Sequence, residues 1–329
     1  MAAIAKAPAK IILLGEHFCV HGAPAISMAI NLYAKVKVEK WKEEGLYISS
    51  KNFGVSAVYQ NKGFLVKEGD MEEAKRILNP IRIAVESTLK NKGLTFKGLK
   101  VEVDSEIPVG VGLGSSAAIT VATIAATAKH FGFNLPKEEV CFLAYDSERY
   151  IHFNPSGVDQ TTSTYGGIIL YRVSSPVKHL KPLKHPVFVI GNTGIRRVTG
   201  DFVKKVGKLK EERKELLESL LKTAENLVLD GVKALESGNV TLFGELMNKN
   251  HELLSKIGVS HEKLELFVDT ARKAGALGAK LTGGGGGGCM IALVKPEKLV
   301  EVARAIREVG GEIYIVETDW MGVQSWVEI

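Results

Sequence analysis

The stretch from Pro108 to Ala118 constrains the fold more than any other part of this sequence. It reads Pro-Val-Gly-Val-Gly-Leu-Gly-Ser-Ser-Ala-Ala and follows an alternating apolar stretch, Leu99–Val103, that predicts a strand. Residues 117–131 contain strong helix formers and little charge, which predicts a buried helix. Glycines let a backbone approach a ligand closely, and unpaired N–H groups at a helix start attract anions. The sequence therefore predicts an anion site between a strand and a helix.

Two better-known phosphate loops do not fit this stretch. A P-loop needs a lysine before its final Ser or Thr, and no lysine precedes Ser115 and Ser116. A dinucleotide-binding turn needs a glycine where Ser115 stands, and no alternating strand–helix pattern opens the chain. A glycine-rich turn with a serine cap, binding nothing, remains the alternative for this loop taken alone.

The composition is that of an ordinary globular protein. The chain has 329 residues, 45% of them hydrophobic and 24% charged, which suits two domains. A net charge of +6 suits anionic ligands, but bases alternate with acids, as in Lys210–Glu215, so no nucleic-acid partner is expected. No apolar run is long enough for a membrane span, and three widely spaced cysteines favour reduced thiols and a cytoplasmic location.

The hydrophobic pattern divides the chain into a β-rich part and a helix-rich part. Strands are expected within residues 10–14, 33–41, 46–50 and 55–60, and Asn79-Pro80 predicts a helix start. Further helices are expected at residues 136–152, 208–237, 240–257, 260–273 and 296–309, and further strands at 187–190 and 312–317. The proline-containing stretch 176–186 predicts a boundary between domains 1–182 and 183–329.

Two more unusual segments lie near the ends of the chain. Residues 10–22 read Lys-Ile-Ile-Leu-Leu-Gly-Glu-His-Phe-Cys-Val-His-Gly, and residues 280–293 contain six consecutive glycines. An apolar strand pattern flanks the glycines, so a close backbone approach to another segment or to a ligand fits better than a linker.

Together these segments resemble the three motifs of the GHMP kinase superfamily, in the same order. The run from Glu148 to Asp159, Glu-Arg-Tyr-Ile-His-Phe-Asn-Pro-Ser-Gly-Val-Asp, is similar to one found in mevalonate kinases. The resemblance implies an α+β fold of two domains, the first like ribosomal protein S5 domain 2 and the second ferredoxin-like with extra helices. It also implies transfer of the ATP γ-phosphate to the 5-hydroxyl of mevalonate. A homodimer is expected only by analogy with relatives.

The resemblance also implies roles for individual residues. Asp159 matches the family's base for the attacking hydroxyl, and Lys10 is expected beside it and the γ-phosphate. ATP is the expected cofactor, together with Mg²⁺ bound by Ser116 and Glu148. Glu16, His17, Arg197 and Thr199 match the substrate side. The expected phosphate-binding residues are Pro108, Val109, Gly110, Val111, Gly112, Leu113, Gly114, Ser115, Ser116, Ala117 and Ala118.

Some positions depart from the family pattern, and rival functions remain. Gln160 stands where Asn is usual, and Phe153 where Gly is usual. The rivals are another kinase of the superfamily, such as a phosphomevalonate or homoserine kinase, and a non-catalytic metabolite sensor. His17, Cys19 and His21 would alternate on a strand and suit zinc, but no fourth ligand accompanies them.

Overall fold

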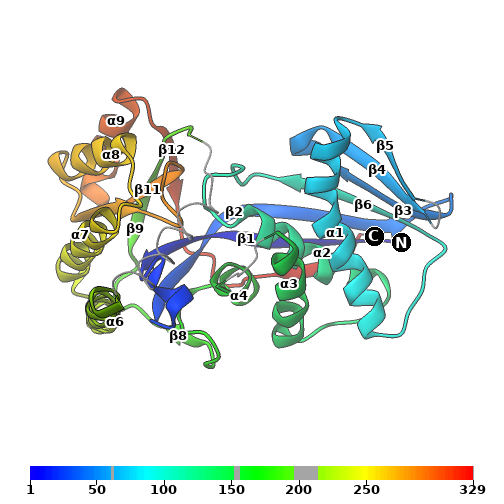
Figure 1. The fold of residues 1–329 in the computed structure, drawn as a ribbon, viewed down its shortest axis with the longest axis horizontal. Helices are drawn as coiled ribbons and strands as arrows, with labels where there is room; N and C mark the ends of the chain where they lie inside the picture. Colours follow the sequence, from blue (N-terminus) through cyan, green and yellow to red (C-terminus); the bar gives the residue numbers. More distant parts are fainter. Residues whose placement is uncertain (61–62, 152–155, 196–213, 329) are drawn as a thin grey trace.

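The computed structural model describes residues 1–60, 63–151, 156–195 and 214–328 (Figure 1). These residues form a nine-stranded and a four-stranded sheet that lie toward opposite ends of the molecule. The order of the first sheet is β13-β1-β2-β6-β3-β4-β5, with β7 added to β2 and β8 to β7. Its strands are β1 (Ala2–Leu14), β2 (Ala25–Lys40), β3 (Gly45–Ser50), β4 (Val55–Gln60), β5 (Gly63–Glu68), β6 (Gly98–Ser105), β7 (Ile168–Tyr171), β8 (Lys178–Leu180) and β13 (Gln324–Glu328).

Helices pack on the first sheet through the apolar side of its strands. Leu99, Val101 and Val103 of β6 are buried and alternate with residues that are not, which confirms the predicted strand. Helix α2 contacts β1 and β2 and is itself covered by α1 and α3, so its side chains are nearly all buried. The helices are α1 (Met71–Asn91), α2 (Ser115–His130), α3 (Lys137–Ile151) and α4 (Val158–Tyr165).

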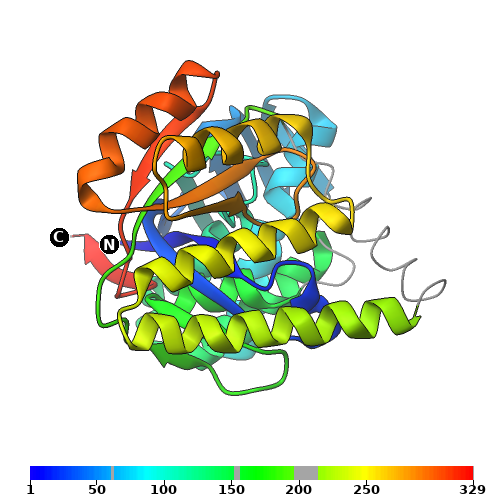
Figure 2. The same ribbon diagram turned by 90° about the vertical axis from the view of Figure 1, so that its left-hand side faces the viewer.

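The second sheet is antiparallel, with the order β10-β11-β9-β12. Helices α7, α8 and α9 pack on it, and α6 packs on α7; both α6 and α7 also reach β1 of the first sheet (Figure 2). Its elements are β9 (Val187–Asn192), α6 (Lys214–Glu236), α7 (Val240–Lys256), α8 (Glu262–Lys273), β10 (Gly278–Leu281), β11 (Cys289–Val294), α9 (Leu299–Glu308) and β12 (Glu312–Val316).

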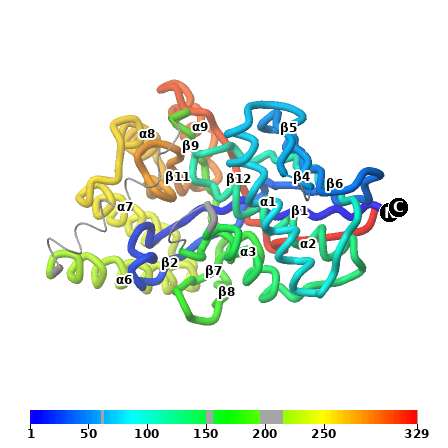
Figure 3. The backbone as a smooth tube through the Cα atoms, turned by 45° about the vertical axis from the view of Figure 1, so that its right-hand side comes forward, coloured from blue at the N-terminus to red at the C-terminus, as the bar shows by residue number. Residues whose placement is uncertain are grey.

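The chain changes sheets between β8 and β9, and then returns. Strand β13 pairs with β1, with Ala2 opposite Glu328, so both ends of the described chain lie side by side (Figure 3). The division into domains 1–182 and 183–329 stays a proposal. Strand β13 does not follow this division, because it lies after residue 183 but belongs to the first sheet.

One helix start was predicted wrongly. Helix α1 begins at Met71, where the Asp70 carboxylate accepts hydrogen bonds from the N–H groups of Glu72 and Glu73, both at 3.0 Å. Pro80 lies inside the helix and is buried. Proline removes one helical hydrogen bond there, while the Asp70 cap and the buried face of the helix favour the helix around it.

Other predicted elements are confirmed, and a few were missed. Helices α2, α3, α7 and α8 lie where the pattern predicted them, and α6 does so within the part that is described. Helix α4 and strands β5, β7, β8 and β13 were not predicted. Among the described helices, none is long and apolar enough to cross a bilayer.

The glycine run 283–288 is tightly packed against neighbouring backbone, as its sequence context predicted. A Cβ on Gly285 would lie 1.9 Å from the carbonyl oxygen of Val259, and one on Gly287 would lie 2.8 Å from Ile195. The N–H of Gly286 donates to Val259 at 2.9 Å, so the two segments are in direct backbone contact. A side chain at these positions would push them apart.

We expect Gly285→Ala to lower the free energy of unfolding by about 2–4 kcal/mol, because the new methyl group collides with backbone and the φ of +70° is strained. Denaturant titration followed by circular dichroism measures the loss. Gly132→Ala is the matched control: its φ is +85° but nothing lies within 4 Å, so backbone strain alone should cost about 1 kcal/mol. Equal losses in both variants would contradict the packing argument.

Candidate active site

The glycine loop joins β6 to α2 and wraps around the side chain of Lys10. Gly110, Gly112 and Gly114 all have positive φ values, of 73°, 92° and 77°. The N–H of Lys10 donates to the carbonyl of Leu113 at 2.9 Å, and its Nζ donates to the carbonyl of Gly112 at 3.0 Å. A Cβ on Gly114 would lie 2.9 Å from the Lys10 side chain. Position 114 therefore requires glycine for two reasons: its φ is positive, and the Lys10 side chain leaves no room for a Cβ atom.

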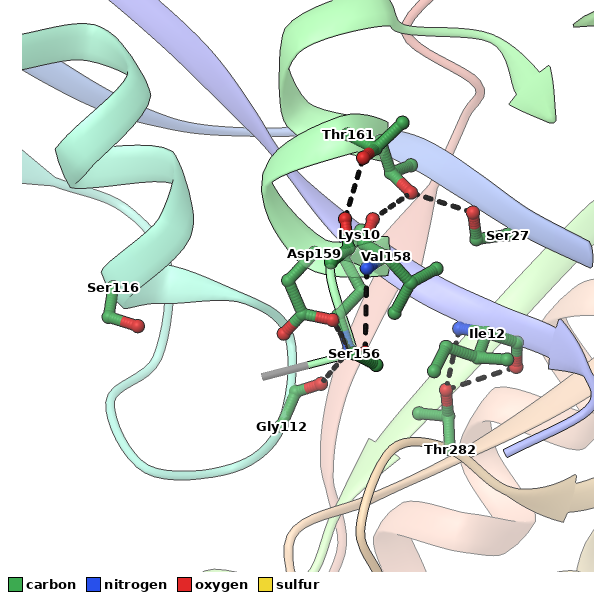
Figure 4. Close-up of polar contacts among 12 residues, drawn as sticks. Lys10, Ile12, Ser27, Gly112, Ser116, Ser156, Val158, Asp159, Thr161 and Thr282 are labelled. Carbon is green, nitrogen blue, oxygen red and sulfur yellow. Dashed lines mark hydrogen bonds and ion pairs between the residues drawn. The ribbon is translucent and has the colours of Figure 1, made fainter. Parts of the chain in front are cut away.

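Lys10 and Asp159 form an ion pair at one edge of this loop (Figure 4). Lys10 Nζ lies 3.2 Å from Asp159 Oδ1, and the side chains are 3% and 35% exposed. The ammonium group is thus enclosed, while the carboxylate faces solvent in part. The structure brings together two residues that the sequence analysis placed side by side only through a family resemblance.

Asp159 stands in the first turn of α4, a helix that the sequence pattern did not predict. Gly157 caps the helix with a φ of 85°, and the hydroxyl groups of Thr161 and Thr162 donate to the backbone one turn earlier, at 2.6 and 2.7 Å. The hydroxyl of Thr162 also lies 2.6 Å from the hydroxyl of Ser27 on β2. These contacts fix α4 on the first sheet and so fix the position of Asp159.

Ser116 and Glu148 lie together on neighbouring helices. The Ser116 hydroxyl, on the first turn of α2, donates to Glu148 Oε1 on α3 at 3.1 Å. Glu148 is buried, and burial, followed by the negative charge of Asp159, raises its pKa to about 7. A hydroxyl and a carboxylate are hard oxygen donors of the kind that Mg²⁺ prefers. A divalent cation beside Glu148 would also favour the ionised form of its carboxylate. This pair therefore fits Mg²⁺.

Glu16 and His17 follow β1 but do not continue it as a strand. The Glu16 side chain is buried and forms an ion pair with Lys280 of β10, and Asn250 of α7 donates to its Oε2 at 3.2 Å. His17 has a φ of 62° and precedes a short 3-10 helix, Phe18–His21, so the strand on which His17, Cys19 and His21 were to alternate is absent here. Within the described residues, no three or more His, Cys, Asp and Glu side chains form a group that could hold a metal ion.

Two predicted residues lie outside the described part of the chain, and three buried polar residues near the site were not predicted. Arg197 and Thr199 lie outside the described residues. Asn250, Lys280 and Thr282 were given no role by the sequence analysis, although all three are buried polar residues. Lys280 and Thr282 lie at the start of the glycine-rich segment 280–293. A lysine next to an apolar strand pattern was the one sequence signal that could have indicated a buried polar contact there.

A separate concavity of about 510 Å³ lies along strands β1, β2, β3 and β6, away from the glycine loop. Lys37 and Lys51 line it, but they pair with Glu328 at 2.6 Å and Asp104 at 3.1 Å. The charges of Lys37 and Lys51 are therefore paired with acidic side chains rather than left open to a ligand.

Family models and curated relatives place this chain among the same group of proteins. The model of the GHMP kinases N terminal domain matches residues 79–167, and that of the GHMP kinases C terminal domain matches residues 232–312. The chain is 40% identical to a mevalonate kinase of Pyrococcus furiosus over 333 residues, covering 98% of each.

Solved structures agree with these relatives. Methanococcus jannaschii mevalonate kinase has a TM-score of 0.81 at 31% identity, covering 96% of this chain and 98% of that one. L. major mevalonate kinase in complex with R-mevalonate has a TM-score of 0.81 at 30% identity, covering 95% of each. The expected two-domain α+β fold is confirmed.

The raised pKa of Glu148 gives a pH-dependent stability prediction. A folded-state pKa of about 7, above the ordinary 4.5, means that ionised Glu148 destabilises the fold above pH 7 and that this cost disappears near pH 4.5. Without divalent cations, Glu148→Gln should therefore raise the free energy of unfolding at pH 8 by up to about 3 kcal/mol, with little effect at pH 4.5.

Urea titrations of both proteins at the two pH values measure this difference. The matched control is Glu297→Gln, because Glu297 is exposed and its substitution should have a small, equal effect at both pH values. A gain for Glu148→Gln that does not depend on pH would contradict the assignment.

Proposed function

This chain belongs to the GHMP kinase family, and we propose that it transfers the γ-phosphate of ATP to the 5-hydroxyl of mevalonate, giving 5-phosphomevalonate and ADP. Similarity to mevalonate kinases over nearly its full length supports this enzyme class and this substrate. The observation that carries the proposal is the ion pair between Lys10 and Asp159 beside the glycine loop.

Asp159 and Lys10 are the proposed catalytic residues. Asp159 accepts the proton of the attacking hydroxyl; since a carboxylate is a weak base for an alcohol, that proton moves late in the reaction. The Lys10 ammonium, held against Gly112, stabilises negative charge as it develops on the transferred phosphoryl group. The short distance between the two side chains supports both roles.

Residues 108–118 are the proposed phosphate site. The N–H groups at the start of α2 and the positive end of its dipole favour the triphosphate. Ser116 and Glu148 would hold Mg²⁺, which when bound neutralises charge on the phosphate oxygens. Their hydroxyl and buried carboxylate place two oxygen donors next to the loop.

The acceptor side of the site is proposed from the family motifs. Arg197 suits the mevalonate carboxylate, because a guanidinium binds a planar anion with two hydrogen bonds, and His17 and Thr199 complete this side. Glu16 belongs to the same motif, but its carboxylate is already bound to Lys280 and Asn250. A homodimer remains a prediction from analogy.

A coupled ADP-release assay tests the acceptor. Purified protein with ATP and Mg²⁺ is offered mevalonate, phosphomevalonate, homoserine or galactose in turn, and mass spectrometry with NMR locates the new phosphate. We expect ADP release with mevalonate and a product phosphorylated at the 5-hydroxyl. Turnover only with another acceptor would identify a different kinase of the family, and binding of ATP and mevalonate without ADP release would identify a sensor.

The role of Asp159 has its own test. Asp159→Asn should lower turnover by about 10²-fold or more, because the amide cannot accept the hydroxyl proton, while nucleotide binding is largely kept. Steady-state kinetics and calorimetric titration with ATP measure the two effects. Asp230→Asn, on an exposed face of α6, is the control and should behave as wild type. Near-normal turnover of Asp159→Asn would remove this residue from the mechanism.

A further inference from the structure

A buried polar cluster connects the end of β1 to β10 and α7. Glu16 follows β1, Lys280 and Thr282 lie in or just after β10, and Asn250 lies on α7. All four side chains are at least 95% buried. We name these residues the β1 clasp: Glu16, Asn250, Lys280 and Thr282.

The clasp binds the backbone of β1 and of the residue that follows it. The Thr282 hydroxyl accepts a hydrogen bond from the N–H of Ile12 at 2.9 Å and donates to the carbonyl of Ile12 at 3.1 Å (Figure 4). Asn250 accepts from the N–H of Gly15 at 3.1 Å. Two points of the chain, within five residues of Lys10, are therefore attached to the part that contains the second sheet.

The charges of the clasp are deeply buried and depend on each other. The ammonium of Lys280 contacts Glu16 and also donates to the carbonyl of Leu281 at 2.7 Å. Removing one member of a buried ion pair leaves the other charge without compensation, which is strongly destabilising, whereas replacing both can be nearly neutral. A buried pair of this kind is weak evidence for stability alone, so a role in geometry is the better explanation.

Strand β1 needs additional support where it carries Lys10. The register of β1 against β2 shifts between Pro8 and Ala9, and again between Ile12 and Leu14. Lys10 therefore lies in a short regular stretch between two irregularities, where the strand ladder constrains the backbone less. The contacts of Thr282 and Asn250 fall at and just beyond the second irregularity.

We propose that the β1 clasp is a positioning device, which fixes Lys10 relative to Asp159 through the backbone of β1. Glu16 acts in it as the partner of Lys280 and does not contact the acceptor. The proposal rests on the proposed function insofar as Lys10 serves the transferred phosphoryl group. Because a misplacement of about 1 Å can lower a rate about 10²-fold, loosening the clasp affects turnover more than it affects binding of the acceptor.

A double-mutant cycle tests the clasp. Glu16→Gln and Lys280→Met should each lower kcat by about 10-fold or more and lower the melting temperature, with KM for the acceptor changed less than about threefold. The combined variant, which buries no charge, should recover melting temperature and most of kcat. Thr282→Val, which keeps the shape and removes the hydroxyl, should also lower kcat without raising KM.

The control is Lys178→Met, because the Lys178–Glu236 pair joins β8 to α6 at 3.4 Å but is exposed. It should leave kcat and melting temperature unchanged. A rise in KM for the acceptor of about 10-fold in Glu16→Gln, not rescued by Lys280→Met, would overturn the proposal in favour of direct substrate contact. Unchanged kcat in all clasp variants would overturn it in favour of a purely structural pair.

The outcome is separable from that of the proposed function. The cycle is measured with whichever acceptor the wild-type protein phosphorylates, so a different substrate would contradict the proposed function without affecting the clasp. If the wild type phosphorylates none of the four acceptors, the proposed function fails; the clasp then predicts that Thr282→Val weakens Lys10-dependent ATP binding, measured by calorimetry against Lys10→Met, and unchanged binding would overturn it.

Discussion

The ammonium group of Lys10 joins three segments that are far apart in the sequence. It contacts Asp159 of α4 and the carbonyl of Gly112 in the glycine loop, from a strand at the start of the chain. A lysine that is 2% exposed has lost most of its hydration, so both partners are needed to compensate it. The relative positions of β1, the loop and α4 therefore follow from satisfying one buried charge.

The loop geometry depends on the same side chain. With Gly114 in a left-handed conformation and in contact with Lys10, the first turn of α2 starts directly beside the ammonium group. Ser116 on that turn then meets Glu148 of α3, whose charge is itself costly to bury. Positive and negative groups are thus arranged around one end of α2, where a triphosphate and its cation would balance them.

Much of the fold could be predicted from the sequence, because the periodicity of β6 and α2 is regular and their ends carry glycine. Helix α4 was missed, since its sequence is rich in threonine and preceded by a glycine that suggests a turn; its hydroxyl groups bond back to the helix and to Ser27 instead. The start of α1 was misplaced because proline at 80 resembled a first-turn residue, whereas the Asp70 cap is the stronger determinant.

The sequence indicated which residues belong to the candidate site, but not which contacts those residues make. Motif resemblance indicated Lys10 and Asp159, whereas the partner of Glu16 depends on tertiary packing between β10 and the end of β1, which no local pattern encodes. The zinc site weighed for His17, Cys19 and His21 would require a strand at these residues, but His17 has a positive φ and is followed by a 3-10 helix, Phe18–His21.

The pairing of β13 with β1 has a consequence for synthesis of the protein. Strand β1 is translated well before β13, so the edge that β1 presents to β13 at residues 2–6 is covered only when β13 has been made. Until then an apolar strand keeps unpaired N–H and C=O groups available to other nascent chains. The first sheet therefore completes its hydrogen bonding only after nearly all the described residues have been translated.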